Sequence, residues 1–188
     1  MQKCPFYHAD NTKPTGSPAF RLQEIELDIK IRFANINDIP LILAFIQQKA
    51  EFDRYPASVE ATAEKLKQTL FCEPPLANVL FAEVESTTVG FATFFQTYST
   101  FLARPGIWLD DLYVKPHIRG KGVGAALMNR LFAIAKERDC GRIEWTVAPD
   151  NIQGIRFYKK QGAQIRNEVR LCRLEYEEIH SSSAVYCL

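Results

Sequence analysis

A glycine-rich turn between an apolar strand pattern and a helix pattern constrains this sequence more than any other feature. Three glycines alternate with other residues over 120–124, after the apolar run 107–114 and at the start of an amphipathic pattern over 122–138. Glycine allows a tight turn and the close approach of a ligand. The first N–H groups of a helix lack intrahelical partners and, with the helix dipole, attract anions. With Arg119 and Lys121 beside it, the turn predicts a pyrophosphate site.

Other glycine motifs fit this turn less well. A dinucleotide-binding turn requires GxGxxG and a Walker A loop requires GxxxxGKS or GxxxxGKT, whereas residues 120–124 read GKGVG. A flexible glycine-rich connection is the structural alternative. The strand and helix patterns on either side argue against it.

Strand and helix patterns alternate along the chain and predict an α/β fold with a mixed α+β sheet. We expect a central, mostly antiparallel, twisted sheet flanked by about four helices. A hairpin loop is expected at 85–88, a turn at 104–106, and a helix end before the prolines at 74 and 75. The expected strands are 29–34, 78–83, 89–98, 107–114, 142–147, 164–167 and 170–176, and the expected helices are one capped by Asn35 or Asn37 and reaching Ala50, then 58–71, 122–138 and 151–161.

The chain divides into three expected segments. Residues 1–28 are rich in Pro, Ser, Thr and Asn and predict an irregular N-terminal extension. A single domain is expected over 29–179, followed by a tail over 180–188. The N-terminus lacks the apolar core of a signal peptide and no run is long enough to span a bilayer, so we expect no membrane association.

The glycine turn and a second block resemble the coenzyme A motif of the GNAT superfamily of N-acetyltransferases. Arg119 to Gly124 are similar to its R-x-x-G-x-G motif, after a strand that ends Leu-Tyr-Val. Asn151, with Phe157-Tyr158 and Gly162, is similar to its N…FY-x-x-x-G block in the next helix. The resemblance covers roughly residues 29–176 in the order of elements.

This resemblance implies that acetyl-CoA is the cosubstrate, that no metal is needed, and that a primary amine attacks the thioester in a ternary complex. It also implies that acetyl-CoA lies between the splayed ends of two strands. Its pantetheine arm would pair with the backbone, and its pyrophosphate would sit on the amides of the turn. The implied cofactor-binding residues are Leu112, Tyr113, Val114, Arg119, Gly120, Lys121, Gly122, Val123, Gly124 and Asn151.

Two residues are candidates for the proton transfers that acetylation of an amine needs. An alkylammonium has a pKa of about 10.4 and must lose a proton before it attacks. Asp110 is the predicted base, and Tyr158, through the FY match, is the predicted acid for the departing thiolate. Asp110 and Asp111 should face opposite sides of their strand unless a bulge intervenes. The alternative to a catalytic Asp110 is an acid that is exposed to solvent or paired with Arg104. The alternative to a catalytic Tyr158 is an aromatic side chain that only packs against its neighbours.

Within the superfamily, the sequence resembles the diamine (spermidine/spermine) acetyltransferase-like group, which includes thialysine acetyltransferases. Residues 49–53, 90–98 and 109–114 are similar to its LAKYE, GFA…TY and LEDFFV segments. The sequence departs by having Asp110 in place of Glu, residues 99–101 as STF in place of DPW, and Gly154 in place of a serine. Of these departures, the loss of the acid in DPW weakens a polyamine assignment most, because it removes a negative charge that would attract a polycation. The implied substrate-binding residues are Phe52, Asp53, Tyr98, Phe101 and Asp111.

Composition narrows the possible partners. The 188 residues carry a formal net charge of +1 and no basic stripe, which argues against nucleic acid. The five cysteines are scattered without a CxxC pair, which favours reduced thiols in the cytoplasm and no metal centre. We expect a small amine substrate and, as in many relatives, a homodimer, to which the apolar end 184–188 could contribute. The alternatives are the same fold acting on an amino acid, a peptide N-terminus or an aminoglycoside, or an acyl-CoA-binding sensor without activity.

Overall fold

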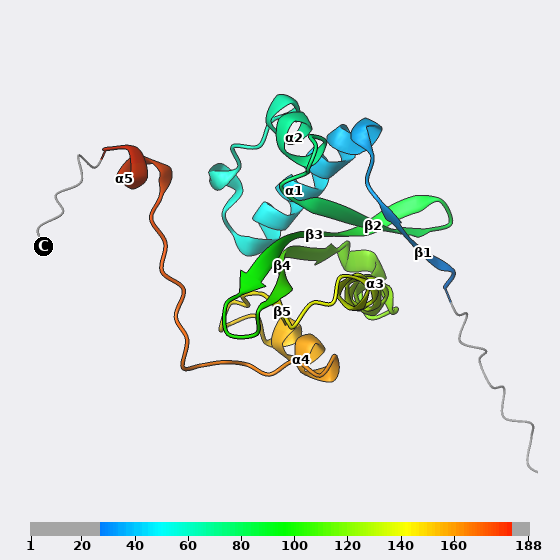
Figure 1. Ribbon diagram of the computed structural model, residues 1–188. Helices are drawn as coiled ribbons and strands as arrows, with labels where there is room; N and C mark the ends of the chain where they lie inside the picture. The colour runs from blue at the N-terminus through cyan, green and yellow to red at the C-terminus, as the bar shows by residue number, and fades with distance from the viewer. Residues whose placement is uncertain (1–26, 182–188) are drawn as a thin grey trace, which may run out of the picture.

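The computed structural model describes residues 27–181, and a five-stranded sheet forms its centre (Figure 1). The strands lie in chain order, the first four antiparallel and the fifth parallel to the fourth. The expected α/β fold with a mostly antiparallel mixed sheet is therefore confirmed. The strands are β1 (Ile29–Phe33), β2 (Asn78–Val84), β3 (Thr87–Ser99), β4 (Arg104–Val114) and β5 (Ile143–Glu144).

Helices cover both faces of the sheet (Figure 1). The alternation along β2 gives the reason, because successive side chains of a strand point to opposite faces. Leu80 and Ala82 pack with the helix α3 (Val123–Glu137) on one face, whereas Phe81 packs with α1 (Ile39–Asp53) and α2 (Ala63–Leu70) on the other. The helices are α1 (Ile39–Asp53), α2 (Ala63–Leu70), α3 (Val123–Glu137), α4 (Ile152–Lys160) and α5 (Tyr176–Ser181), with 3-10 turns η1 (Ile36–Asp38), η2 (Pro56–Ser58) and η3 (Pro116–Ile118).

A predicted cap starts the first helical segment. The Oδ1 atom of Asn35 accepts a hydrogen bond from the N–H of Asn37 at 3.0 Å, and the carboxylate of Asp38 accepts one from the N–H of Asn35 at 2.7 Å. The guanidinium of Arg32 on β1 donates two further hydrogen bonds to Asp38, at 2.7 and 2.9 Å. This network ties the start of α1 to the edge strand of the sheet.

Two predicted boundaries are wrong by a few residues. Helix α2 starts at Ala63 rather than at residue 58, because the hydroxyl of Thr62 caps it and the preceding proline lies in a separate 3-10 turn. The turn expected at 104–106 lies inside β4, since Pro105 still pairs with Tyr98. The chain instead reverses over 100–103, where Ala103 has a φ of 49°.

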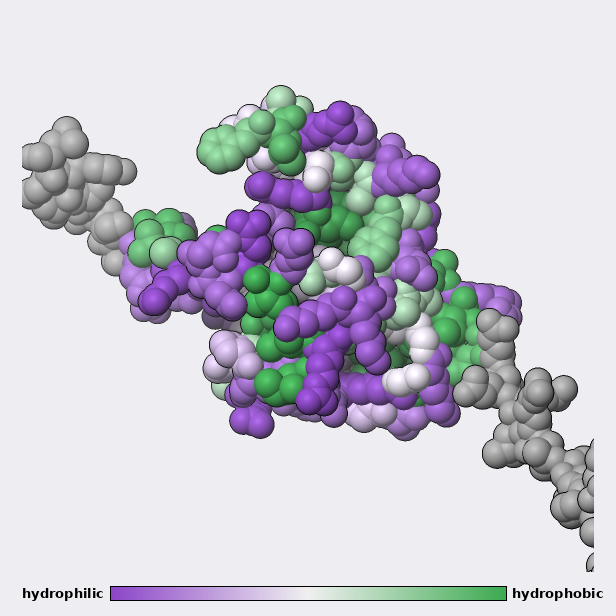
Figure 2. All heavy atoms as spheres, turned by 90° about the horizontal axis from the view of Figure 1, so that it is seen from below, coloured by the Kyte–Doolittle hydropathy of each residue, from purple (hydrophilic) through white to green (hydrophobic). Residues whose placement is uncertain are grey.

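The C-terminal segment departs most from the expectation. Within the described residues, 164–175 form no strand and β5 spans only two residues, so the strands predicted at 164–167 and 170–176 are wrong. The segment runs away from the sheet, where no neighbouring strand offers hydrogen bonds (Figure 1). Its side chains Val169, Leu171 and Leu174 are exposed, and Figure 2 shows hydrophobic surface on the part of the molecule that projects at the left. Helix α5 crosses the expected start of the tail at residue 180. Residues 1–26 and 182–188 lie outside the described part.

We expect Asp38→Asn to lower the free energy of unfolding by about 1 kcal/mol, because it weakens the capping box and removes the ion pair with Arg32. The hydrogen bonds from Arg32 hold the pKa of Asp38 below its ordinary value. This stabilisation is therefore present above the unfolded pKa of about 3.9 and is lost as the pH falls through the lower folded pKa. Urea unfolding of both proteins at neutral and acid pH measures it. Equal stability at neutral pH would contradict the prediction.

Candidate functional site

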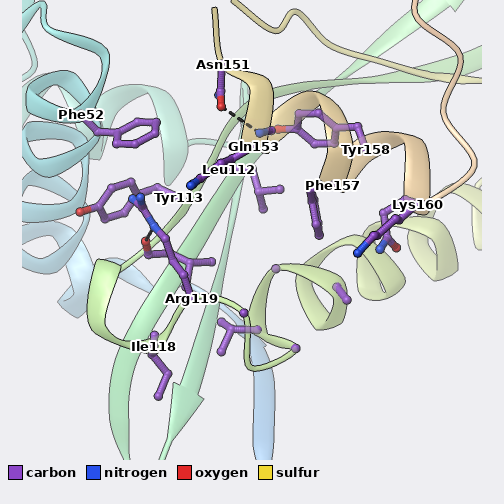
Figure 3. A pocket seen from close by; sticks show the side chains of 18 residues that line it. Phe52, Leu112, Tyr113, Ile118, Arg119, Asn151, Gln153, Phe157, Tyr158 and Lys160 are labelled. Atoms are coloured by element: carbon purple, nitrogen blue, oxygen red, sulfur yellow. Dashed lines mark hydrogen bonds between the residues drawn. The ribbon is translucent and has the colours of Figure 1, made fainter.

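A pocket lies where β4 separates from the chain that follows β5. The two strands pair only at Ile107 with Ile143 and Trp108 with Glu144. Beyond these pairs lies a pocket of about 490 Å³, with walls from the end of α1, the end of β4, the glycine turn and α4 (Figure 3). The predicted residues that line it are Phe52, Leu112, Tyr113, Val114, Arg119, Gly120, Gly122, Val123, Gly124, Asn151 and Tyr158.

The glycine turn presents unpaired amides to this pocket. Gly122 caps α3 with a φ of 88°, a backbone conformation that glycine adopts without strain. The first α-helical hydrogen bond runs from the N–H of Ala126 to the carbonyl of Gly122, so the N–H groups of residues 123–125 lie before it. Gly124 also lets α3 approach α4, since a Cβ there would lie 3.3 Å from the ring of Phe157. The turn therefore has the backbone geometry of a helix start that attracts anions.

The backbone of Leu112 and Val114 faces the open side of β4. The N–H of Lys115 donates to the carbonyl of Val89 on β3 at 2.9 Å. Because residues of an antiparallel strand direct their backbone groups alternately to its two edges, residues 112 and 114 direct theirs away from β3. The carbonyl of Val114 accepts a hydrogen bond from Nε of Arg119 at 2.7 Å. An edge with hydrogen-bonding groups thus borders the pocket.

The side chain of Arg119 also connects the turn to α1. Its guanidinium lies 4.6 Å from the ring centroid of Phe52 and 5.4 Å from that of Tyr113 (Figure 3). Contacts of this kind between a cation and an aromatic face are attractive. Arg119 therefore holds the end of α1 against the glycine turn as well as lining the pocket.

A register shift in β4 brings two aspartates to one face of the sheet. Leu109 and Asp111 pair with adjacent residues of β3, so Asp110 is an extra residue in a bulge. Leu109 packs on the α3 side, whereas Tyr113 packs on the α1 side. Asp111 shares the face of Tyr113, and Asp110 lies on that face too, since it alternates with Leu109. The two aspartates were expected to face opposite sides of the strand unless a bulge intervened, and the structure has that bulge.

Asp111 lies in a partly buried ionic cluster. Its Oδ1 lies 3.4 Å from Nζ of Lys49, and the hydroxyl of Thr93 donates to its Oδ2 at 3.2 Å. Lys49 also forms an ion pair with Asp53, one turn further along α1. Burial raises the pKa of Asp111, and the charge of Asp110 raises it further, whereas Lys49 acts in the opposite direction. Asp110 itself is exposed.

Tyr158 reaches the pocket from α4 (Figure 3). Its ring packs against Trp145, with the centroids 4.9 Å apart. Burial raises the pKa of Tyr158 to about 12, and the charges of Asp111 and Asp53 act in the same direction. The phenol therefore keeps its proton at neutral pH and can donate it.

Asn151 has a structural role that is compatible with its predicted one. Its Oδ1 accepts a hydrogen bond from the N–H of Gly154 at 2.8 Å and so caps α4 (Figure 3). A Cβ at position 154 would lie 2.7 Å from the Asn151 side chain. Glycine at position 154 is therefore the residue that this capping geometry accommodates. Asn151 lines the pocket at the same time.

Several predicted residues lie outside the pocket lining. Phe101 is 98% exposed, and Tyr98 is also exposed, near the reversal between β3 and β4. Arg104, considered as a partner of Asp110, pairs instead with Asp139 at 2.8 Å. Predicted residues that do not line the pocket are Asp53, Tyr98, Phe101, Asp110, Asp111 and Lys121.

Sequence reasoning missed several residues of this region, Lys49 and Trp145 among them. Lys49 lies four residues before Asp53, a spacing at which helix side chains meet, so that ion pair could have been predicted. Its contact with Asp111 could not, because it joins α1 to a strand 62 positions away in the chain, from residue 49 to residue 111. Trp145 was also missed, since its partner Tyr158 comes from another element.

Two kinds of feature are absent from residues 27–181. Among these residues, no group of three or more His, Cys, Asp or Glu side chains is arranged to hold a metal ion. Over the same range, none of the helices has the length and apolar character needed to cross a bilayer.

The Acetyltransferase (GNAT) family matches residues 44–163, which is more than half of the chain. The chain belongs to the GNAT acetyltransferase family. A thialysine N-epsilon-acetyltransferase of Bos taurus is 31% identical over 72% of this chain and 84% of its own length. An L-ornithine N5-acetyltransferase of Arabidopsis thaliana is 28% identical over 87% of this chain and 88% of its own length.

Solved structures agree with this assignment. An integron cassette protein from V. cholerae superposes with a TM-score of 0.68 at 25% identity, covering 81% of this chain and 96% of its own. A probable acetyltransferase superposes with a TM-score of 0.66 at 20% identity, covering 78% of this chain and 97% of its own, which supports the fold alone. The protein is thus a GNAT N-acetyltransferase, and the pocket at the split between β4 and β5 is its candidate active site.

We expect the phenol of Tyr158 in this acetyltransferase to titrate with a pKa of about 12, because burial and two nearby carboxylates oppose the phenolate. An ultraviolet titration of the wild type minus that of Tyr158→Phe isolates its signal. The difference should stay flat through the ordinary tyrosine pKa of about 10. A Tyr158-dependent phenolate signal at that ordinary pKa would contradict the prediction.

Proposed function

We propose that this acetyltransferase moves the acetyl group of acetyl-CoA to a primary amine of a small diamine, polyamine or lysine-like substrate, with both substrates bound together. The observation that carries the proposal is a carboxylate cluster next to a pocket that begins at an anion-binding helix start. Asp53, Asp110 and Asp111 make up this cluster, and Tyr158 lies within range of the charge of Asp53 and Asp111. The relatives named for thialysine and ornithine, amino acids with a second amine, support the same substrate class.

The residues around the pocket fit acetyl-CoA, which supplies an activated acetyl thioester. A cavity of about 490 Å³ is of the size that ligand pockets have. The amides of residues 123–125 suit the pyrophosphate, and the backbone edge at Leu112 and Val114 suits the amides of the pantetheine arm. Lys160 lines the pocket and suits a further phosphate.

The acidic cluster has the charge that an ammonium substrate requires. Asp53 and Asp111 attract the cation, and Asp110, which is exposed, accepts its proton directly or through water. The nitrogen then forms a bond to the acetyl carbon as the carbon–sulfur bond breaks. Tyr158 donates a proton to the departing sulfur and regains one from solvent. The ammonium thus loses one proton to Asp110 before the attack, and the attacking nitrogen loses a second proton to solvent as the amide forms. The products are an amide and a thiol.

We expect Asp110→Asn to lower kcat by about 10²–10⁴-fold at neutral pH, the usual contribution of a positioned general base. The loss should shrink as the pH approaches the amine pKa of about 10.4, because a free amine needs no base. Release of coenzyme A thiol, measured with ornithine, thialysine, lysine, putrescine and spermidine, gives both results.

Asp139→Asn is the matched control for this experiment. Asp139 is an exposed aspartate whose partner is Arg104, outside the pocket lining, so its turnover should equal that of the wild type. Unchanged turnover in Asp110→Asn would refute the base assignment. Binding of acetyl-CoA without turnover of any amine would refute the enzymatic proposal and favour a sensor.

We also propose that the protein is a homodimer held partly by its C-terminal segment. This segment runs away from the sheet (Figure 1). It exposes the apolar side chains Val169, Leu171, Leu174, Tyr176 and Ile179, and apolar surface of this kind marks association sites. The cytoplasmic location stays a prediction; within the described residues Cys72, Cys140 and Cys172 are free thiols.

Light scattering at micromolar concentration tests the dimer. We expect twice the 21.5 kDa of one chain, and the mass of a single chain after removal of residues 164–188. A full-length protein that scatters as a monomer would overturn this proposal.

A further inference from the structure

A lysine ammonium lies inside the acidic cluster. Nζ of Lys49 forms an ion pair with Asp53 and lies 3.4 Å from Oδ1 of Asp111. The side chains of Lys49, Asp53 and Asp111 keep 19%, 39% and 25% of their surface exposed. The cluster is therefore accessible to a small polar ligand. Phe52, the residue before Asp53, lines the pocket itself, so the cluster borders the pocket.

This ammonium weakens the attraction of the carboxylates for a substrate that carries only positive charges. A diamine brings an ammonium at both ends, and each is repelled by Lys49 while it is attracted by the carboxylates. A carboxylate on the substrate reverses the sign of that contact. Lys49 has three N–H donors, and its two carboxylate contacts engage two of them. One donor remains for an anionic group.

We propose that Lys49 and Asp53 form a subsite for the main-chain end of a free α-amino acid. Lys49 binds the α-carboxylate and Asp53 binds the α-ammonium, while the side-chain amine points toward Asp110, Asp111 and Tyr158. The two residues lie one helical turn apart on α1 and already pair, so opposite charges stand side by side, as they do on an amino acid zwitterion. This inference rests on the proposed function and narrows its substrate to amino acids with a side-chain amine.

Lys49→Met tests the subsite, because methionine keeps much of the side-chain length and removes the charge. Ornithine and putrescine are the paired substrates, since putrescine is ornithine without its carboxylate. We expect the wild type to have the higher kcat/KM for ornithine. In Lys49→Met that value should fall by about 10- to 100-fold, the usual loss of a charged hydrogen bond. The value for putrescine should stay the same or rise.

Three further variants separate recognition from a structural role of Lys49. Lys49→Arg keeps the cation and should keep the preference for ornithine. Asp53→Asn removes the partner of an ammonium that both substrates carry, so both kcat/KM values should fall and their ratio should persist. Lys65→Met on α2 removes a lysine that pairs with the exposed Glu60, outside the pocket lining, and should behave as the wild type does.

The outcomes separate this inference from the proposed function. An equal fall for both substrates in Lys49→Met, with the ratio unchanged, would mean that Lys49 only joins α1 to β4, and it would overturn the subsite. A wild type that prefers putrescine would overturn it as well. If the wild type acetylates no amine, the proposed function fails, and calorimetric binding decides the subsite. Ornithine must then bind more tightly than putrescine, and Lys49→Met must abolish that difference.

Discussion

The bulge at Asp110 in β4 is the constraint on which the site depends. Before the bulge, β4 pairs with β3 along one edge and, at two residues, with β5 along the other. After it, the side chains have changed faces, so Asp111 meets α1 and Leu112 lines the pocket. One additional residue in a strand thus separates an acidic face, suited to an amine, from an open backbone edge, suited to a thioester carrier.

The charges around this bulge support one another. Asp111 is partly buried, and its charged form is costly there without a cation nearby. Lys49 provides that cation and pairs with Asp53 as well. Burial, and after it the charges of Asp111 and Asp53, raise the pKa of Tyr158, so that the phenol stays protonated. In the proposed reaction, the cluster that attracts the ammonium therefore also helps to keep the proton that the leaving thiolate needs.

Local signals predicted much of the fold and the coenzyme side of the site. The start of the helix at the glycine turn, the cap at Asn35 and the strand expected at 78–83 depend on neighbours close in the chain, and the structure agrees with each. The strands expected at 164–167 and 170–176 do not form, because a residue pattern suited to a strand forms one only beside a partner strand. Tyr98 and Phe101 were assigned by resemblance, and the hairpin reversal holds both on the exposed surface.

The sequence by itself determined the family, the glycine turn before a helix and the identity of Asp110, Tyr158 and Asn151 as candidates, because motif spacing and helix starts are local properties. Only the tertiary structure decided that Asp110 and Asp111 share a face, and that Lys49 lies between Asp53 and Asp111. The physical reason is that strand register and the packing of α1 on the sheet bring together residues far apart in the chain, and sequence spacing does not encode those distances.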